Sequence, residues 1–172
     1  MNFHNSKEKG KSAERFAEMY FTKNNIIFED VRESVEWQGK DVDYIANNEA
    51  WEVKLNLQEA RKGKPGLFFW VELDVSGRPG WWHASRAEWF MFVTGDSRRA
   101  VAIRNDAAFN CFVNNLIEHG KHGENDFNRY DYKKDIWYNR LPVTSKCMRV
   151  YLAQLEKSGV DYKEIATRRK RN

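Results

Sequence analysis

Apolar residues recur at two different spacings along this chain, and the change from one to the other divides it into helices and strands. Between Ser12 and Lys23 they return every three or four residues, which predicts an amphipathic helix with Ser12 as its N-cap. Shorter apolar runs separated by turn residues follow. They predict strands over 26–31, on both sides of Asn47-Asn48, and over 67–75.

The second half of the chain shows the same alternation of spacings. The predicted elements are a helical start at 85–89, a hairpin of strands 90–93 and 100–104 across Gly95-Asp-Ser, a helix over 106–119, an exposed loop over 120–140 and a final helix over 145–158. A chain of 172 residues in this order fits one α/β domain over 1–172, with a basic tail at about 166–172.

The residues around Asn47-Asn48 carry the strongest chemical signal. Asn tolerates the positive φ that both central positions of a type I′ turn require, so a two-residue hairpin turn is predicted here. Pairing across this turn sets Asp43 opposite Glu52, with Cβ atoms about 4.5–5.5 Å apart on one face. Two carboxylates placed in this way destabilise the hairpin unless a cation neutralises them.

Lys54 would lie on the same face as Glu52, because side chains alternate along a strand, whereas Trp51 and Val53 would point to the other face. An exposed hairpin with a solvated polar face is the plain alternative. Here, however, the charges interrupt the apolar β-run Ala50–Leu55 instead of flanking it, and charges in such a place need partners. An acid pair beside an ammonium indicates a metal-dependent nuclease.

These residues resemble the motif of the PD-(D/E)XK nuclease superfamily, an acidic residue on one strand and Glu-x-Lys on the next. Val42 stands where that motif has proline. The stretch Gly39–Ala46 looks like the Gly-x-x-x-Asp-hydrophobic-hydrophobic-Ala version of archaeal and phage Holliday junction resolvases, with Asp41 as a rival for the first acidic position. Upstream, Lys9–Phe16 is similar to the Gly-x-x-x-Glu-Arg opening of the superfamily's first helix, whose glutamate, here Glu14, often completes the metal site.

The resemblance implies a restriction-endonuclease-like fold, in which a central mixed β-sheet is flanked by α-helices. It also implies hydrolysis of DNA phosphodiester bonds with Mg²⁺, or with Mn²⁺ as a substitute, and raises cleavage of four-way or branched DNA by a homodimer. Hard cations of this kind prefer oxygen ligands. The expected metal ligands are Asp43, Glu52, the Val53 carbonyl and Glu14, and Lys54 is expected to orient the attacking water.

Several candidate residues keep a structural alternative. Glu14 would lie in the first helical turn, where a carboxylate also stabilises the helix N-terminus. Basic residues in a predicted short helix or loop over 56–66 would either hold the DNA backbone or belong to a solvated connection. Trp81-Trp82 would stack on bases or fill the core. The candidate DNA-binding residues are Arg61, Lys62, Lys64 and His83, of which His83 has a structural alternative, and Glu72 is a further candidate acid.

Composition agrees with a DNA partner without selecting it. The 29 Lys and Arg residues exceed the 25 Asp and Glu residues and give a formal net charge of +4. Cys111 and Cys147 have neither the spacing of a zinc site nor that of a disulfide framework, and no apolar run is as long as a membrane span. A cytoplasmic protein is expected, with a phage-encoded one acting in its host as one origin. Two alternatives stay open: a nucleic-acid-binding module of the same fold that does not cleave, and a protein-interaction factor.

Overall fold

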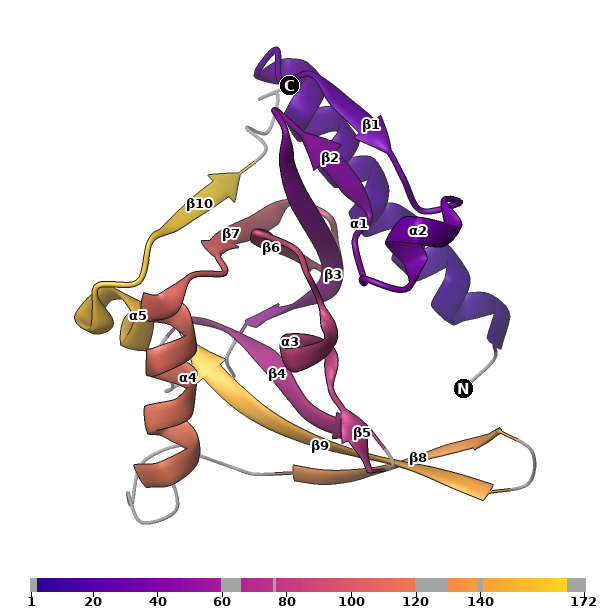
Figure 1. Cartoon of the computed structure of the whole chain (residues 1–172), viewed down its shortest axis with the longest axis vertical. Helices are drawn as coiled ribbons and strands as arrows, with labels where there is room; N and C mark the ends of the chain where they lie inside the picture. Colours follow the sequence, from indigo (N-terminus) through magenta and orange to yellow (C-terminus); the bar gives the residue numbers. More distant parts are fainter. Residues whose placement is uncertain (1–2, 60–65, 76, 120–129, 139–140, 167–172) are drawn as a thin grey trace.

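The computed structural model describes residues 3–59, 66–75, 77–119, 130–138 and 141–166 (Figure 1). The helices in these residues are α1 (Phe3–Lys23), α2 (Val35–Gln38), α3 (Trp81–Ala84), α4 (Ala107–His119) and α5 (Leu152–Ser158). The strands are β1 (Phe28–Asp30), β2 (Tyr44–Ala46), β3 (Glu49–Glu59), β4 (Leu67–Val75), β5 (Arg78–Pro79), β6 (Trp89–Thr94), β7 (Arg99–Arg104), β8 (Tyr130–Tyr138), β9 (Leu141–Tyr151) and β10 (Tyr162–Ala166). None of the described helices combines the length and apolarity that crossing a bilayer would take.

The strands form one sheet of mixed direction. Its main path runs β10-β7-β6-β3-β4-β9-β8, while β2 pairs with β3, β1 with β2, and β5 with β4. β3 and β6 are parallel, and the other described pairs are antiparallel. Helices lie against this sheet, α1 beside β3 and α4 at the opposite end of the molecule (Figure 1). The predicted fold class, a mixed β-sheet flanked by α-helices, is confirmed.

The central strand β3 takes part in both halves of the sheet. Its first part pairs with β2 and β6, and its last two residues pair with β4. Between these parts, the side chain of Asn56 bonds to the backbone of Trp70. Asn56 Nδ2 donates to the carbonyl of Trp70 at 2.6 Å, and Asn56 Oδ1 accepts from its N–H at 3.2 Å. The amide therefore satisfies backbone groups that would otherwise need another partner where the two halves diverge.

Alternate residues of the sheet enter two hydrophobic cores. The first core lies under α1 and includes Phe21 of that helix with Trp51 of β3 and Met91 of β6. The second core includes Phe92 of β6 and Phe109 of α4. Since neighbouring residues of a strand point to opposite faces, the residues that flank Trp51 lie on the other face of β3.

The predicted β2–β3 hairpin is confirmed. Asn47 and Asn48 have φ values of 51° and 64°, as a type I′ turn requires. Ala46 pairs with Glu49, the register that the sequence predicts. The predicted hairpin of β6 and β7 and the predicted helix at α4 are confirmed as well.

Some boundaries in the first half were predicted wrongly. α1 begins at Phe3, so Ser12 is not its N-cap and Glu14 lies well inside the helix. The polar stretch before Ser12 has too few apolar residues to show a helical period. β1 covers only Phe28–Asp30 of the predicted 26–31, β3 continues to Glu59 where a helix or loop is predicted, and the short helix α3 ends before 85–89.

The second half holds three strands that sequence reasoning missed. β8 lies within the predicted loop over 120–140, and β9 continues to Tyr151 within the predicted helix over 145–158. Met148 and Val150 are buried, and Arg149 between them is less so, which is the period of a strand. β10 pairs with β7. The remainder of the predicted loop and residues 167–172 of the basic tail lie outside the described residues.

Candidate active site

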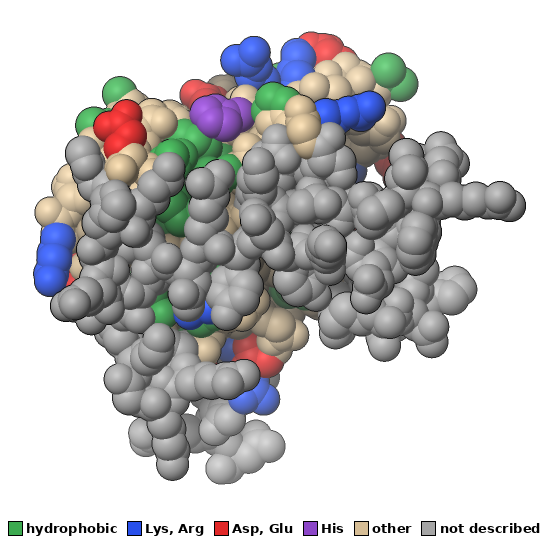
Figure 2. All heavy atoms as spheres, turned by 90° about the horizontal axis from the view of Figure 1, so that it is seen from below, with side chains coloured by type: hydrophobic (Ala, Val, Ile, Leu, Met, Phe, Trp, Pro, Cys, Tyr) green, Lys and Arg blue, Asp and Glu red, His purple; other side chains and the backbone are tan. Residues whose placement is uncertain are grey.

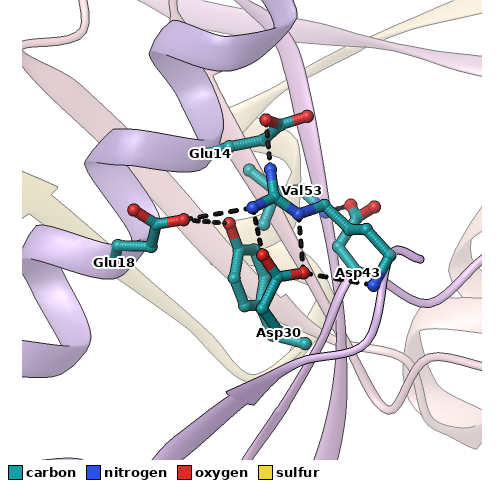
Figure 3. Close-up of polar contacts among 7 residues, drawn as sticks. Glu14, Glu18, Asp30, Asp43 and Val53 are labelled. Carbon is teal, nitrogen blue, oxygen red and sulfur yellow. Dashed lines mark hydrogen bonds and ion pairs between the residues drawn. The ribbon is translucent and has the colours of Figure 1, made fainter. Parts of the chain in front are cut away.

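The hairpin brings Asp43 beside β3 at the position that the sequence predicts. Asp43 directly precedes β2, and the Tyr44–Trp51 pair sets it opposite Glu52. The Asp43 N–H donates to the Trp51 carbonyl at 2.8 Å. Asp43 Oδ2 accepts a hydrogen bond from the Val53 N–H at 2.7 Å (Figure 3). This side-chain bond fixes one carboxylate oxygen and leaves the other, Asp43 Oδ1, available as a ligand.

Glu52 is a buried carboxylate on the face of β3 opposite to that of Trp51. Its side chain is 4% exposed and forms an ion pair with Lys54, two residues along the same strand. Glu52 Oε2 is buried and has no hydrogen-bond partner within the described part of the chain. A buried carboxylate oxygen without a partner is costly, so this atom is a candidate for a cation or a proton.

Burial raises the pKa values of the two acids of the site. Burial raises the pKa of Glu52 to about 7, although the Lys54 ammonium acts in the opposite direction. Burial also raises the pKa of Asp43, although the Val53 N–H opposes this change. Burial by itself would lower the pKa of Lys54, but the Glu52 carboxylate and its acidic neighbours raise it. Burial therefore makes the charged form of both acids costly, and a bound cation would favour that form.

These residues line a cavity of about 260 Å³ between α1, the 32–43 segment and β3. Its acidic lining residues are Glu14, Asp41, Asp43 and Glu52, and its basic ones are Arg32 and Lys54. Four carboxylates therefore face two cations. The cavity is open at the molecular surface, so a substrate would reach it without the opening of the core.

Asp41, the rival for the first acidic position, also lines the cavity but is placed differently. It is exposed and has a φ of 49°, and its carbonyl accepts a hydrogen bond from Ser85 Oγ at 2.9 Å. Asp43, by contrast, is opposite Glu52 and bonds to β3. The geometry therefore favours Asp43 as the partner of Glu52.

Glu14 reaches the same cavity from the middle of α1, but it is engaged by Arg32. The two side chains form an ion pair (Figure 3). Arg32 also binds Glu18, at 3.2 Å, and Asp30, whose Oδ1 accepts from Arg32 Nε at 2.8 Å. The Tyr44 hydroxyl donates to Glu18 Oε1 at 2.9 Å, and the guanidinium lies 5.1 Å from the centre of the Tyr44 ring.

Sequence reasoning missed this Arg32 cluster, which we define as Glu14, Glu18, Asp30, Arg32 and Tyr44. One local signal was present, because Glu14 and Glu18 are four residues apart and share a face of α1. The Asp30-x-Arg32 spacing is a second signal, because the Asp30 side chain also accepts from the Arg32 backbone N–H at 3.1 Å. Neither pattern shows that the two segments meet.

The structure does not bring the remaining candidates into the cavity. His83 is exposed on α3, and neither it nor Glu72 of β4 lines the cavity. Trp81 and Trp82 are 8% and 3% exposed and belong to the core, so they do not offer a stacking surface. Arg61, Lys62 and Lys64 lie outside the described residues.

The donor set fits a hard divalent cation. Among the described residues, no group of three or more His, Cys, Asp and Glu side chains is placed to hold a metal ion. Mg²⁺, however, commonly binds through one or two carboxylates, with water and substrate phosphate completing its shell. Asp43 and Glu52 offer two such carboxylates, one with a buried oxygen that lacks a partner in the described chain, and Glu14 is within the same cavity.

The described side chains on the lower face of the molecule give no comparable signal. Acidic and basic side chains of the described residues are intermixed there (Figure 2). A field of one sign, which steers nucleic acid to a surface, is not formed by the described side chains in that view.

No family model, curated protein or solved structure matches this chain. The residues of the site are therefore the basis for any functional conclusion.

Proposed function

We propose that this chain is a metal-dependent endonuclease that hydrolyses phosphodiester bonds of DNA, with four-way or branched DNA as the substrate to test first. The observation that carries the proposal is the pair Asp43 and Glu52, fixed side by side on a hairpin, with Lys54 on the same face and with Glu52 Oε2 buried and, among the described residues, unpartnered. Lys54 pairs with Glu52 Oε1, so a cation at Oε2 would supply the partner that this buried oxygen lacks among the described residues.

Asp43 and Glu52 would hold Mg²⁺ or Mn²⁺, with the Val53 carbonyl as a further candidate donor. A metal held there supplies a water of lowered pKa and stabilises charge that develops on the phosphate. Lys54 would orient the attacking water and offset the charge of the transition state. The hydrogen bond from the Val53 N–H holds the Asp43 carboxylate toward β3, so that the acid does not need to be ordered on binding.

The test is incubation of the purified chain with labelled duplex, single-stranded, flap and four-way-junction DNA in the presence of Mg²⁺, Mn²⁺ or EDTA. The Asp43→Asn and Glu52→Gln variants should lose cleavage while they keep the circular dichroism spectrum and DNA binding of the wild type. Glu36→Gln is the matched control, because its carboxylate forms an exposed ion pair with Lys40 outside the cavity. Full activity of both site variants would refute the assignment.

A panel that is bound but never cut, with or without metal, would instead indicate a nucleic-acid-binding module of the same fold. Failure to bind any of the nucleic acids would favour a protein-interaction factor.

A further inference from the structure

The Arg32 cluster and the acid pair meet at one residue, Glu14. Of the three carboxylates around Arg32, Glu14 alone lines the cavity that contains Asp43 and Glu52, since neither Glu18 nor Asp30 belongs to its lining. Glu14 is therefore in a position to serve either the guanidinium or a ligand of the acid pair.

Glu14 holds a nitrogen of Arg32 that the other two carboxylates do not hold. Asp30 accepts from Nε and Nη2, and Glu18 accepts from Nη2. Glu14 pairs with Nη1. If Glu14 left, Asp30 and Glu18 would still anchor the guanidinium, and Nη1 would lose the partner that it has among the described residues. Arg32 itself lines that cavity, and its side chain is 25% exposed, so an anion can reach it.

We propose that Arg32 and Glu14 form an exchange device: a phosphodiester anion takes the place of Glu14 at Arg32 Nη1, and the released Glu14 becomes an additional oxygen donor for the metal beside Asp43 and Glu52. This inference rests on the proposed nuclease function and deepens it. An arginine fork suits phosphate oxygens, and a carboxylate suits a hard divalent cation. After the exchange, Arg32 pairs with the phosphodiester anion and Glu14 pairs with the metal cation, so both groups keep a partner of opposite charge.

The exchange predicts that binding of anion and metal is coupled. A site that holds the metal with two carboxylates in the absence of anion, and with three in its presence, binds the metal more tightly when the anion is there. Linkage requires that the metal strengthen anion binding by the same factor. Couplings between sites are typically about 5- to 150-fold in affinity, so an effect of about fivefold or more is expected here.

The experiment is a titration of the full chain with Mn²⁺, in which free Mn²⁺ is measured by electron paramagnetic resonance with and without dimethyl phosphate, the smallest phosphodiester. A titration without protein corrects for direct binding of Mn²⁺ to the phosphodiester. In the wild type, dimethyl phosphate should lower the Kd for Mn²⁺ about fivefold or more. In Glu14→Gln the Kd without anion should equal that of the wild type, and the effect of the anion should be lost.

Two further variants distinguish the exchange from a general effect of charge near the metal. Glu18→Gln removes a carboxylate that binds Arg32 but does not line the cavity, so it should keep the coupling. Arg32→Lys lacks the forked Nη1, so Glu14 should be free at the outset, and Mn²⁺ should bind more tightly than in the wild type and independently of the anion. Both variants are compared by circular dichroism to verify folding.

Three outcomes would overturn the exchange. Weaker Mn²⁺ binding by Glu14→Gln in the absence of anion would show that Glu14 is a ligand from the start. Coupling that survives in Glu14→Gln would show that the anion acts on the metal directly. If dimethyl phosphate does not change the Kd of the wild type for Mn²⁺ but metal-dependent cleavage is intact, the exchange is refuted and the nuclease function is retained. A wild type that neither binds Mn²⁺ nor cleaves DNA would refute both proposals.

Discussion

Two groups of carboxylates share one corner of this molecule, and they differ in how their charge is met. Around Arg32, three carboxylates surround one guanidinium, and the Arg32 hydrogen bonds lower the pKa of Asp30. In the pair of Asp43 and Glu52, burial raises both pKa values and one oxygen has no partner in the described chain. The first group is already satisfied by the protein, and the second is arranged for something that binds to it.

This difference shows why a count of acidic residues does not identify a site. The Arg32 cluster has more carboxylates, yet its hydrogen bonds to one forked cation make it a structural link between α1, β1 and β2. The acid pair has fewer carboxylates and a single ammonium, but low solvent exposure at Glu52 gives its charge a high cost. Changes at the acid pair should therefore act first on catalysis, whereas changes around Arg32 should act on stability and on the proposed coupling between metal and anion.

The largest effect is expected on catalysis at the acid pair. Lys54→Ala should lower kcat about 10²- to 10³-fold, because removal of one group that stabilises transition-state charge has this magnitude. Single-turnover cleavage of the preferred DNA measures the loss. Lys40→Ala, which removes an exposed lysine paired with Glu36, should leave the rate unchanged. Equal rates for wild type and Lys54→Ala would remove Lys54 from the mechanism.

The next effect is on stability at the Arg32 cluster. Arg32→Met should lower the free energy of unfolding by about 2–3 kcal/mol, because it leaves three carboxylates together without their cation in a partly buried place. Urea denaturation at pH 7.5 measures the loss. The matched change Arg98→Met breaks an exposed pair with Asp96 and should cost under about 1 kcal/mol. Similar losses in both variants would mean that the Arg32 cluster is no more than a surface network.

A third effect is a pH dependence of the folding stability that is caused by Glu52. Its pKa is about 7 in the folded protein and near the ordinary 4.5 in the unfolded chain. Between these values the folded state retains a proton that the unfolded state has lost, so stability falls as the pH rises, and the full cost is present above pH 7. Below about 4.5 both states are protonated and the cost vanishes.

The free energy of unfolding of Glu52→Gln, relative to that of the wild type, should therefore rise by about 2–3 kcal/mol between pH 4.5 and pH 8. Each unit of difference between the folded and unfolded pKa values contributes up to about 1.4 kcal/mol. Urea denaturation without metal at several pH values gives this difference. Glu36→Gln should show no such trend, because its carboxylate is exposed. A stability difference between Glu52→Gln and wild type that does not vary with pH would show that Glu52 is not a buried acid of raised pKa.

The smallest effect is expected at Tyr44. Tyr44→Phe removes the hydrogen bond to Glu18 but keeps the ring against Arg32, so stability should fall by about 1 kcal/mol and cleavage should not change. Tyr162→Phe is the control, since it removes a hydroxyl bond to Glu156 at an exposed place and should cost less. Thermal unfolding followed by circular dichroism resolves the two. Loss of cleavage in Tyr44→Phe would show that the Tyr44 hydroxyl itself takes part in the reaction.

The elements that could be predicted from the sequence are those built from neighbouring residues. The turn at Asn47-Asn48 has its own chemistry, and the alternation after it places Glu52 and Lys54 on one face, so local pattern alone was enough to predict this part of the site. The helix α4 could be predicted for the same reason, because its apolar period is regular.

The elements and contacts that were missed or predicted wrongly depend on partners far away in the chain. Arg32 meets Glu14 and Glu18, which are 18 and 14 residues earlier, and no local spacing reports that contact. β9 contains residues that suit a helix or a strand, and its pairing with β4 decides between them. α1 extends through a polar segment that has no apolar period. Tertiary contacts, more than local preference, determine these elements.

The two-residue turn at Asn47-Asn48 also limits how this gene can change. Strand pairing has a period of two, so the loss or gain of one codon in the turn would exchange the two faces of β3. Trp51 would then turn toward the cavity, and Glu52 and Lys54 toward the apolar core under α1. We therefore expect variation at this turn to replace its asparagines, with glycine for example, while its length is kept.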